Sequence, residues 1–121
     1  MTPIDRVRRM ADDALVAAFR RDGACCVRGA LSPDEVAVLA RGIDANLAAP
    51  SPRALVASRP DDTGFFIEDF CCWADNPDYR RTACDSLLPL LAARLMGSQR
   101  VRLYHDHMLT KQARTQTRTP W

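Results

Sequence analysis

The segment Ser32-Pro33-Asp34-Glu35 is the strongest local structural signal in the chain. The serine can cap a helix, the proline suits the first helical position, and the glutamate three residues after the serine completes a capping box. Apolar residues then recur at helical spacing as far as Leu47. The pattern predicts a helix over residues 33–47, and any fold of this chain has to bury its apolar face.

Three further segments have helical patterns. A short amphipathic helix is expected over residues 13–21, with Asp12 as its cap and Gly23 as its stop. Asn76-Pro77 is expected to open another helix. The leucine-rich segment 86–95 predicts a helix that ends at Gly97, and Pro89 indicates either a break nearby or a second helix whose first turn contains the proline.

Strand patterns alternate with these helices. Residues 24–28 are β-prone and are followed by Gly29, so they predict a short strand, and residues 65–67 predict another. Residues 48–63 contain three prolines and no periodic apolar face, which predicts an exposed connection within one fold. With 121 residues the chain is about the size of one domain, and the mixture of elements indicates an α+β class.

Residues 100–111 predict a long strand, and the polar candidates for chemistry gather there. Side chains alternate between the two faces of a strand. One face is expected to carry Leu103, His105, His107, Leu109 and Lys111, and the other Arg102, Tyr104, Asp106, Met108 and Thr110.

His105-Asp106-His107 suggests a metal site, because histidine and carboxylate are common ligands of iron and zinc. Asp106 should project away from the two histidines, however, so the tripeptide supplies two converging ligands rather than three. We therefore expect His105 and His107 to line a cavity or to be hydrogen-bonded in a core. Lys111 can either pair with the carboxylate of a small acid ligand or be a solvated strand end, and the sequence leaves both readings open.

Charge and composition exclude several classes of function. The 17 basic and 15 acidic residues give a net charge of +2 and alternate along the chain, so no basic stripe for nucleic acid is present. No apolar run reaches the roughly 20 residues of a membrane span, and the N-terminal residues are charged, so cytoplasmic residence is expected. Motifs of hydrolases and of phosphate-binding loops are absent.

Five cysteines, four of them in adjacent pairs, do not make a disulfide framework. Neighbouring residues of a strand point to opposite faces, so neither Cys25-Cys26 nor Cys71-Cys72 can grip one metal with both thiolates. We expect the cysteines to be small buried residues in a reducing compartment.

The chain as a whole resembles the amino-terminal part of phytanoyl-CoA dioxygenase-like enzymes, which use Fe(II) and 2-oxoglutarate. The resemblance rests on segments 19–23, 31–35 and 95–97, and above all on the run Tyr104 to Lys111 followed by a polar loop and Thr119-Pro120-Trp121. In that family the last run leads into a His-x-Asp iron motif. Residues 1–121 are therefore expected to form the N-terminal portion of a single oxygenase domain, with 112–121 as the loop that leads to an iron motif the chain lacks.

The resemblance also implies a fold, cofactors and site residues. It implies the helices and first strands of a double-stranded β-helix, or jelly roll, as an incomplete barrel. His107 resembles a position that contacts 2-oxoglutarate in relatives, and Lys111 is expected to line the same pocket. The parent enzyme is expected to hydroxylate a small organic substrate with Fe(II) and 2-oxoglutarate, and the chain alone is expected to be inactive and to hold no catalytic iron.

Two alternatives remain open at this point. One is a non-catalytic interaction module that binds a partner chain or self-associates through exposed strand edges. The other is a zinc or iron ion held by His105 and His107 together with a cysteine.

Overall fold

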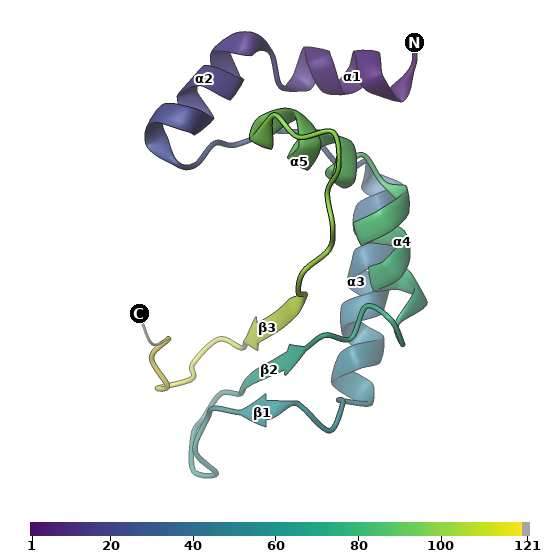
Figure 1. The fold of residues 1–121 in the computed structure, drawn as a ribbon. Helices are drawn as coiled ribbons and strands as arrows, with labels where there is room; N and C mark the ends of the chain where they lie inside the picture. Colours follow the sequence, from purple (N-terminus) through teal and green to yellow (C-terminus); the bar gives the residue numbers. More distant parts are fainter. Residues whose placement is uncertain (120–121) are drawn as a thin grey trace.

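The computed structural model describes residues 1–119, which form helices packed on a small antiparallel sheet (Figure 1). The architecture is therefore a mixed, α+β one. In chain order the elements are α1 (Pro3–Met10), α2 (Asp13–Asp22), α3 (Pro33–Ala48), β1 (Leu55–Val56), β2 (Phe66–Phe70), α4 (Pro77–Asp85), α5 (Leu88–Met96) and β3 (His107–Lys111).

The capping signals read from the sequence fix where the helices begin and end. At the start of α3 the Ser32 hydroxyl accepts a hydrogen bond from the Glu35 amide, and the Glu35 carboxylate accepts one from the Ser32 amide, which confirms the capping box. Asp12 caps α2, and Gly23 ends it with φ at +75°, a conformation that favours glycine. Pro89 lies in the first turn of α5, as one of the two expected arrangements has it.

The first helix, α1, was not predicted. Thr2 and Asp5 form a capping box like that of Ser32 and Glu35, and Pro3 occupies the first helical position. The sequence signal Thr-Pro-Ile-Asp therefore repeats the logic of Ser-Pro-Asp-Glu, with aspartate in place of glutamate.

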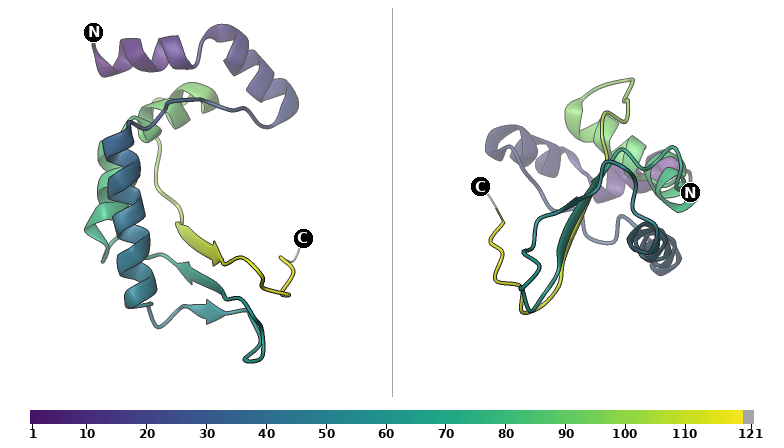
Figure 2. Two further views of the ribbon diagram at one scale, coloured as in Figure 1. Left: turned by 180° about the vertical axis from the view of Figure 1, so that it is seen from behind. Right: turned by 90° about the horizontal axis from the view of Figure 1, so that it is seen from below.

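The chain curves so that α1, α2 and α5 lie at one end and the sheet at the other, with α3 and α4 side by side between them (Figures 1 and 2). One core cluster joins Val7 of α1, and Ala11 just after that helix, to Leu91 of α5. A second cluster, built around Ile67 and Met108, packs the sheet against α3 and α4. Within residues 1–119, every helix is too short or too polar to traverse a lipid bilayer.

The strands are ordered β1-β2-β3 with antiparallel pairing throughout. Phe66 lies opposite Lys111, Glu68 opposite Leu109, and Phe70 opposite His107. β1 falls within residues 48–63, so this segment is more than the exposed connection that was expected: it supplies an edge strand.

Two strand predictions were wrong. Residues 24–28 form no strand, and of residues 100–111 only His107–Lys111 do. A strand needs a hydrogen-bonding partner. The five residues of β2 pair only with residues 107–111, so residues 100–106 have no partner strand. Residues 100–106 instead run from α5 to the sheet without strand pairing (Figure 1).

Candidate functional site

The two faces of the β2–β3 pair differ sharply. Ile67 and Met108 face α3 and α4 and are almost fully buried, with 3% and 6% of their surface exposed. The opposite face, which we call the open face, carries Phe66, Glu68, Phe70, His107, Leu109 and Lys111, because residues directly across an antiparallel pair share a face. Phe66 is the exception to its openness, since it is fully buried at the Lys111 end of the face. The alternation predicted for this strand is confirmed over residues 107–111.

His107 is held on the open face by its neighbours from β2. Its ring stacks on the Phe70 ring with the centroids 4.3 Å apart. Its Nε2 atom lies 3.5 Å from a carboxylate oxygen of Glu68, and about a third of the His107 side chain remains exposed. The imidazole therefore has a fixed orientation and still meets solvent.

Lys111 ends β3 on the same face. Its ammonium group lies 5.5 Å from the centre of the Phe66 ring and 3.5 Å from the Thr119 hydroxyl. Within residues 1–119 no carboxylate forms an ion pair with it. An exposed ammonium without an internal counter-ion is available to an anionic ligand.

The His105-Asp106-His107 tripeptide does not converge on one point. The Asp106 carboxylate accepts hydrogen bonds from the amides of Cys72 and Trp73, at 3.0 and 3.2 Å, so it serves the turn after β2. His105 lies before β3 and places Nδ1 3.5 Å from the sulfur of Cys71. In the described part of the chain no three His, Cys, Asp or Glu side chains are grouped so as to hold a metal ion. The alternative of a histidine and cysteine metal site thus gains no support.

The cysteines are less buried than expected. Cys72 is buried, and burial raises the pKa of its thiol. Cys26, Cys71 and Cys84 are exposed and Cys25 is half-buried, all as free thiols. The prediction of burial was wrong for the three exposed residues because they lie in connecting segments or on the outer surface of a helix rather than within a packed strand.

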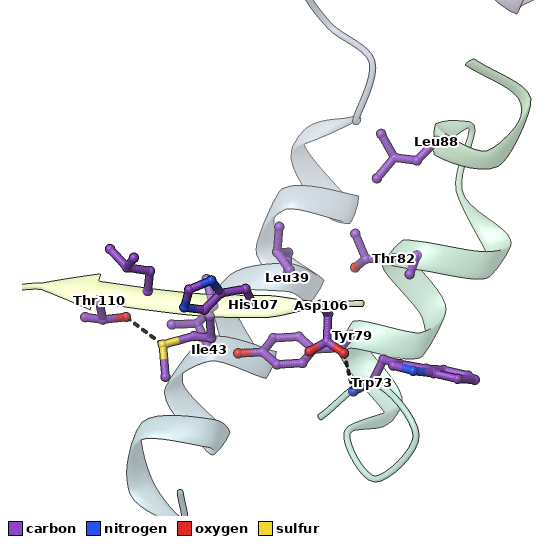
Figure 3. Close-up of a pocket in the computed structure, with 12 residues that line it drawn as sticks. Leu39, Ile43, Trp73, Tyr79, Thr82, Leu88, Asp106, His107 and Thr110 are labelled. Atoms are coloured by element: carbon purple, nitrogen blue, oxygen red, sulfur yellow. Dashed lines mark hydrogen bonds between the residues drawn. The ribbon is translucent and has the colours of Figure 1, made fainter. Parts of the chain in front are cut away.

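A cavity of about 390 Å³ lies between α3, α4 and the segment 106–110 (Figure 3). We expected both histidines to line a cavity or to be hydrogen-bonded in a core; His107 is among the residues that line this cavity, whereas His105 is not and its side chain is exposed. Most of the wall is apolar, with Leu39 and Ile43 from α3. The Tyr79 hydroxyl already donates to Asn46, so this polar group of the lining is committed to the fold. The cavity therefore suits an apolar group. The polar groups that are available to a ligand, His107 and Lys111, lie on the open face.

A buried polar network anchors β2 behind the open face. Asp69 is fully buried, and its carboxylate accepts hydrogen bonds from the Asn46 side chain, from both the amide and the hydroxyl of Ser51, and from the Phe70 amide. Burial alone would raise the pKa of Asp69, but these hydrogen bonds outweigh it and hold the pKa below its usual value. Burial raises the pKa of Tyr79, which donates to Asn46, to about 12.

The loop after β3 is fastened by Asp62. Its carboxylate accepts from the hydroxyls of Thr115 and Thr117 and from the amides of Gly64 and Gln116. The hydrogen bond from Thr115 is the largest of the influences that hold the pKa of Asp62 below its usual value. The predicted loop 112–121 is irregular over residues 112–119, and Pro120 and Trp121 lie outside the described residues.

Sequence reasoning missed Glu68 and Phe70, the β2 residues that position His107. The signal was present as an alternation of Phe66, Glu68 and Phe70 on one face. The strand was predicted from the three consecutive apolar residues 65–67 only, whereas β2 continues to Phe70.

These features define an α+β protein that packs one face of a small antiparallel sheet on helices and presents a histidine, a lysine and a glutamate on the other. The chain belongs to the phytanoyl-CoA dioxygenase (PhyH) family, whose profile matches residues 19–121. The resemblance seen in the sequence is thereby confirmed, and the family is one of dioxygenases that generally depend on Fe(II) and 2-oxoglutarate. No curated protein and no solved structure matches the chain.

Proposed function

We propose that this chain forms the helical flank and first strands of an Fe(II)- and 2-oxoglutarate-dependent dioxygenase of jelly-roll fold, which hydroxylates a small organic substrate. In this proposal the open face is a wall of the cofactor pocket. Lys111 binds a carboxylate of 2-oxoglutarate, and His107 contacts the same cofactor. The observation that carries the proposal is an exposed lysine that forms no ion pair within residues 1–119, on one face with an oriented histidine, in the segment that matches the family.

The spacing of the two residues suits a dicarboxylate. Positions 107 and 111 are four residues apart in one strand, which at about 3.3 Å per residue separates their backbones by roughly 13 Å. With their backbones this far apart, the two side chains are not placed to contact the same carboxylate. An elongated oxoacid with a charged group at each end can contact Lys111 at one end and approach His107 with the other.

Charge favours a carboxylate at Lys111 rather than beside Glu68. Glu68 lies beside His107 and gives that end of the face a negative charge, whereas Lys111 stands at the far end of β3. One carboxylate of the oxoacid is therefore assigned to Lys111. The apolar cavity that His107 also lines is available for an apolar part of the substrate.

Residues 1–119 do not fit an iron centre, since no three potential ligands are grouped among them. When bound, Fe(II) would supply activation of oxygen in an enzyme of this family, and we assign no step of that chemistry to the described residues. The proposal therefore includes the expectation that the chain alone does not turn over 2-oxoglutarate. If the purified chain consumed oxygen and 2-oxoglutarate together without any added protein, that expectation would be wrong.

The cofactor contact can be tested by titrating the 121-residue chain with 2-oxoglutarate and following amide chemical shifts by NMR. We expect Lys111→Met to weaken binding about tenfold or more, because a hydrogen bond to a charged group contributes roughly 1.5–3 kcal/mol. Arg102→Met removes a positive charge from an exposed residue outside the open face and should leave the affinity unchanged. Equal losses in the two variants, or no binding by the unaltered chain, would contradict the role given to Lys111.

A further inference from the structure

Cys71 occupies a fixed and strained position at the end of β2. Its φ angle is +54°, in the left-handed region that residues other than glycine rarely adopt. Its amide donates to the Asp106 carbonyl at 2.9 Å. The Arg53 guanidinium donates to the carbonyls of Phe70 and Cys71 at 2.7 and 3.2 Å. The backbone around the thiol is thus held on both sides, and such strain concentrates at functional positions.

The thiol has an imidazole partner. The Cys71 sulfur lies 3.5 Å from Nδ1 of His105, and both side chains are exposed. The His105 ring lies 5.9 Å from the Phe70 ring and 6.4 Å from the Tyr104 ring, so aromatic neighbours flank it on two sides. A thiol within hydrogen-bonding reach of an oriented base is the arrangement that activates a cysteine nucleophile.

The charged groups nearby leave this pair free to react. The Asp106 carboxylate is occupied by the amides of residues 72 and 73, and Glu68 lies at 3.5 Å from His107 rather than at His105. Arg53 brings a positive charge to the carbonyl of Cys71 itself.

We propose that Cys71 and His105 form a thiol-modification site that reacts with low-molecular-weight disulfides. His105 accepts the thiol proton at Nδ1 as the sulfur attacks one sulfur of the disulfide. A new bond joins Cys71 to that sulfur, the old sulfur–sulfur bond breaks, and the second half leaves as a thiol carrying the proton from His105. Cys71 is oxidised and the departing half is reduced, so no further reactant is needed. The inference does not depend on the oxygenase function.

The chain provides its own controls. Both of its histidines lie at this end of the sheet, so among the described residues the exposed thiols of Cys26 and Cys84 have no imidazole beside them. Cys72 follows Cys71 directly but is buried, and its thiol is hydrogen-bonded to the Phe70 carbonyl. Cys26 and Cys84 are therefore controls for an exposed thiol that lacks a base, and Cys72 is the control for a neighbouring thiol that is not exposed.

The test is to treat the folded chain with oxidised glutathione near neutral pH and to follow the modification of each cysteine by peptide mass spectrometry. We expect Cys71 to react about tenfold or more faster than Cys26 and Cys84, in line with the gain that a positioned base provides. Chemical denaturation should abolish the difference, because it separates residues 71 and 105.

Two substitutions of His105 distinguish base assistance from simple exposure. His105→Phe keeps a ring against Phe70 and removes the nitrogen, and His105→Gln keeps a polar group without an equivalent base. Either should lower the Cys71 rate to that of Cys84 while the rates of Cys26 and Cys84 stay constant, which also reports that the fold is intact. A Cys71 rate equal to that of Cys84 in the unaltered chain, or undiminished in both variants, would overturn the proposal.

Discussion

Replacing Asp69 with asparagine is expected to lower the free energy of unfolding by about 2–4 kcal/mol, although the two side chains have nearly the same shape. The carboxylate is buried and accepts from Asn46, Ser51 and the Phe70 amide. An amide keeps only one of the two acceptor oxygens. The Ser51 hydroxyl can rotate to accept from the new amide nitrogen, but a backbone amide that faced the lost oxygen cannot.

The magnitude follows from these contacts. Hydrogen bonds to a charged acceptor contribute roughly 1.5–3 kcal/mol and neutral ones about 0.5–1.5, and a buried donor left without an acceptor costs about 1–3. Removing a buried charge relieves its desolvation and offsets part of the loss. The balance is a destabilisation of about 2–4 kcal/mol, or a fall in Tm of roughly 10 °C for a chain of this size.

Urea denaturation followed by circular dichroism measures this difference, with Asp44→Asn as the matched control at an exposed position of α3. The control should change stability by less than about 0.5 kcal/mol. The folded pKa of Asp69 lies below the unfolded value of about 3.9, so its contribution is present above that pH and is lost as pH falls towards the folded pKa. The gap between the unaltered chain and Asp69→Asn should therefore narrow below about pH 4. A loss under 1 kcal/mol at pH 7, or a gap that does not change with pH, would refute the reasoning.

Two further predictions concern the loop after β3 and the start of α3. Gly64→Ala should destabilise the chain by roughly 1–3 kcal/mol in thermal denaturation, because its new Cβ would meet the Thr115 amide nitrogen at 2.2 Å and force the loop away. Faster hydrogen exchange at Gln116 should accompany it, and unchanged exchange would mean that the loop tolerates the methyl group. Ser32→Ala should remove the cap of α3 and lower stability by about 1 kcal/mol, whereas Ser32→Asp should retain most of it. Equal stability of the alanine and aspartate variants would show that the cap contributes little.

The helices were the predictable part of this fold. Caps and stops such as Asp12, Gly23 and Ser32 act through hydrogen bonds to residues three or four positions away, so their partners are visible in a short window of sequence. The one helix that was missed, α1, carries the same kind of signal at Thr2 and Asp5. The information for this helix is therefore present in the sequence, at the same spacing as the cap of α3.

The candidate site was predictable only in part. His107 and Lys111 share a face because side chains alternate along any strand, and that geometry needs no knowledge of the partner. Whether the face is buried or open depends on which side the helices cover, and the packing of Met108 against Ile67 and Tyr79 decides it. The sequence left the role of Lys111 open for that reason.

The sequence by itself determined the local conformations: the helix ends, the parity of residues 107–111 and the irregular course of residues 112–119. Only the tertiary structure decided where strands exist, because backbone hydrogen bonds between strands join residues far apart in the chain, as the bond from the Cys71 amide to the Asp106 carbonyl at the end of the β2–β3 pair shows. The same holds for the contact of Cys71 with His105, which lie 34 positions apart. Long-range contacts of this kind are set by the packing of the sheet on α3 and α4, and no local pattern encodes them.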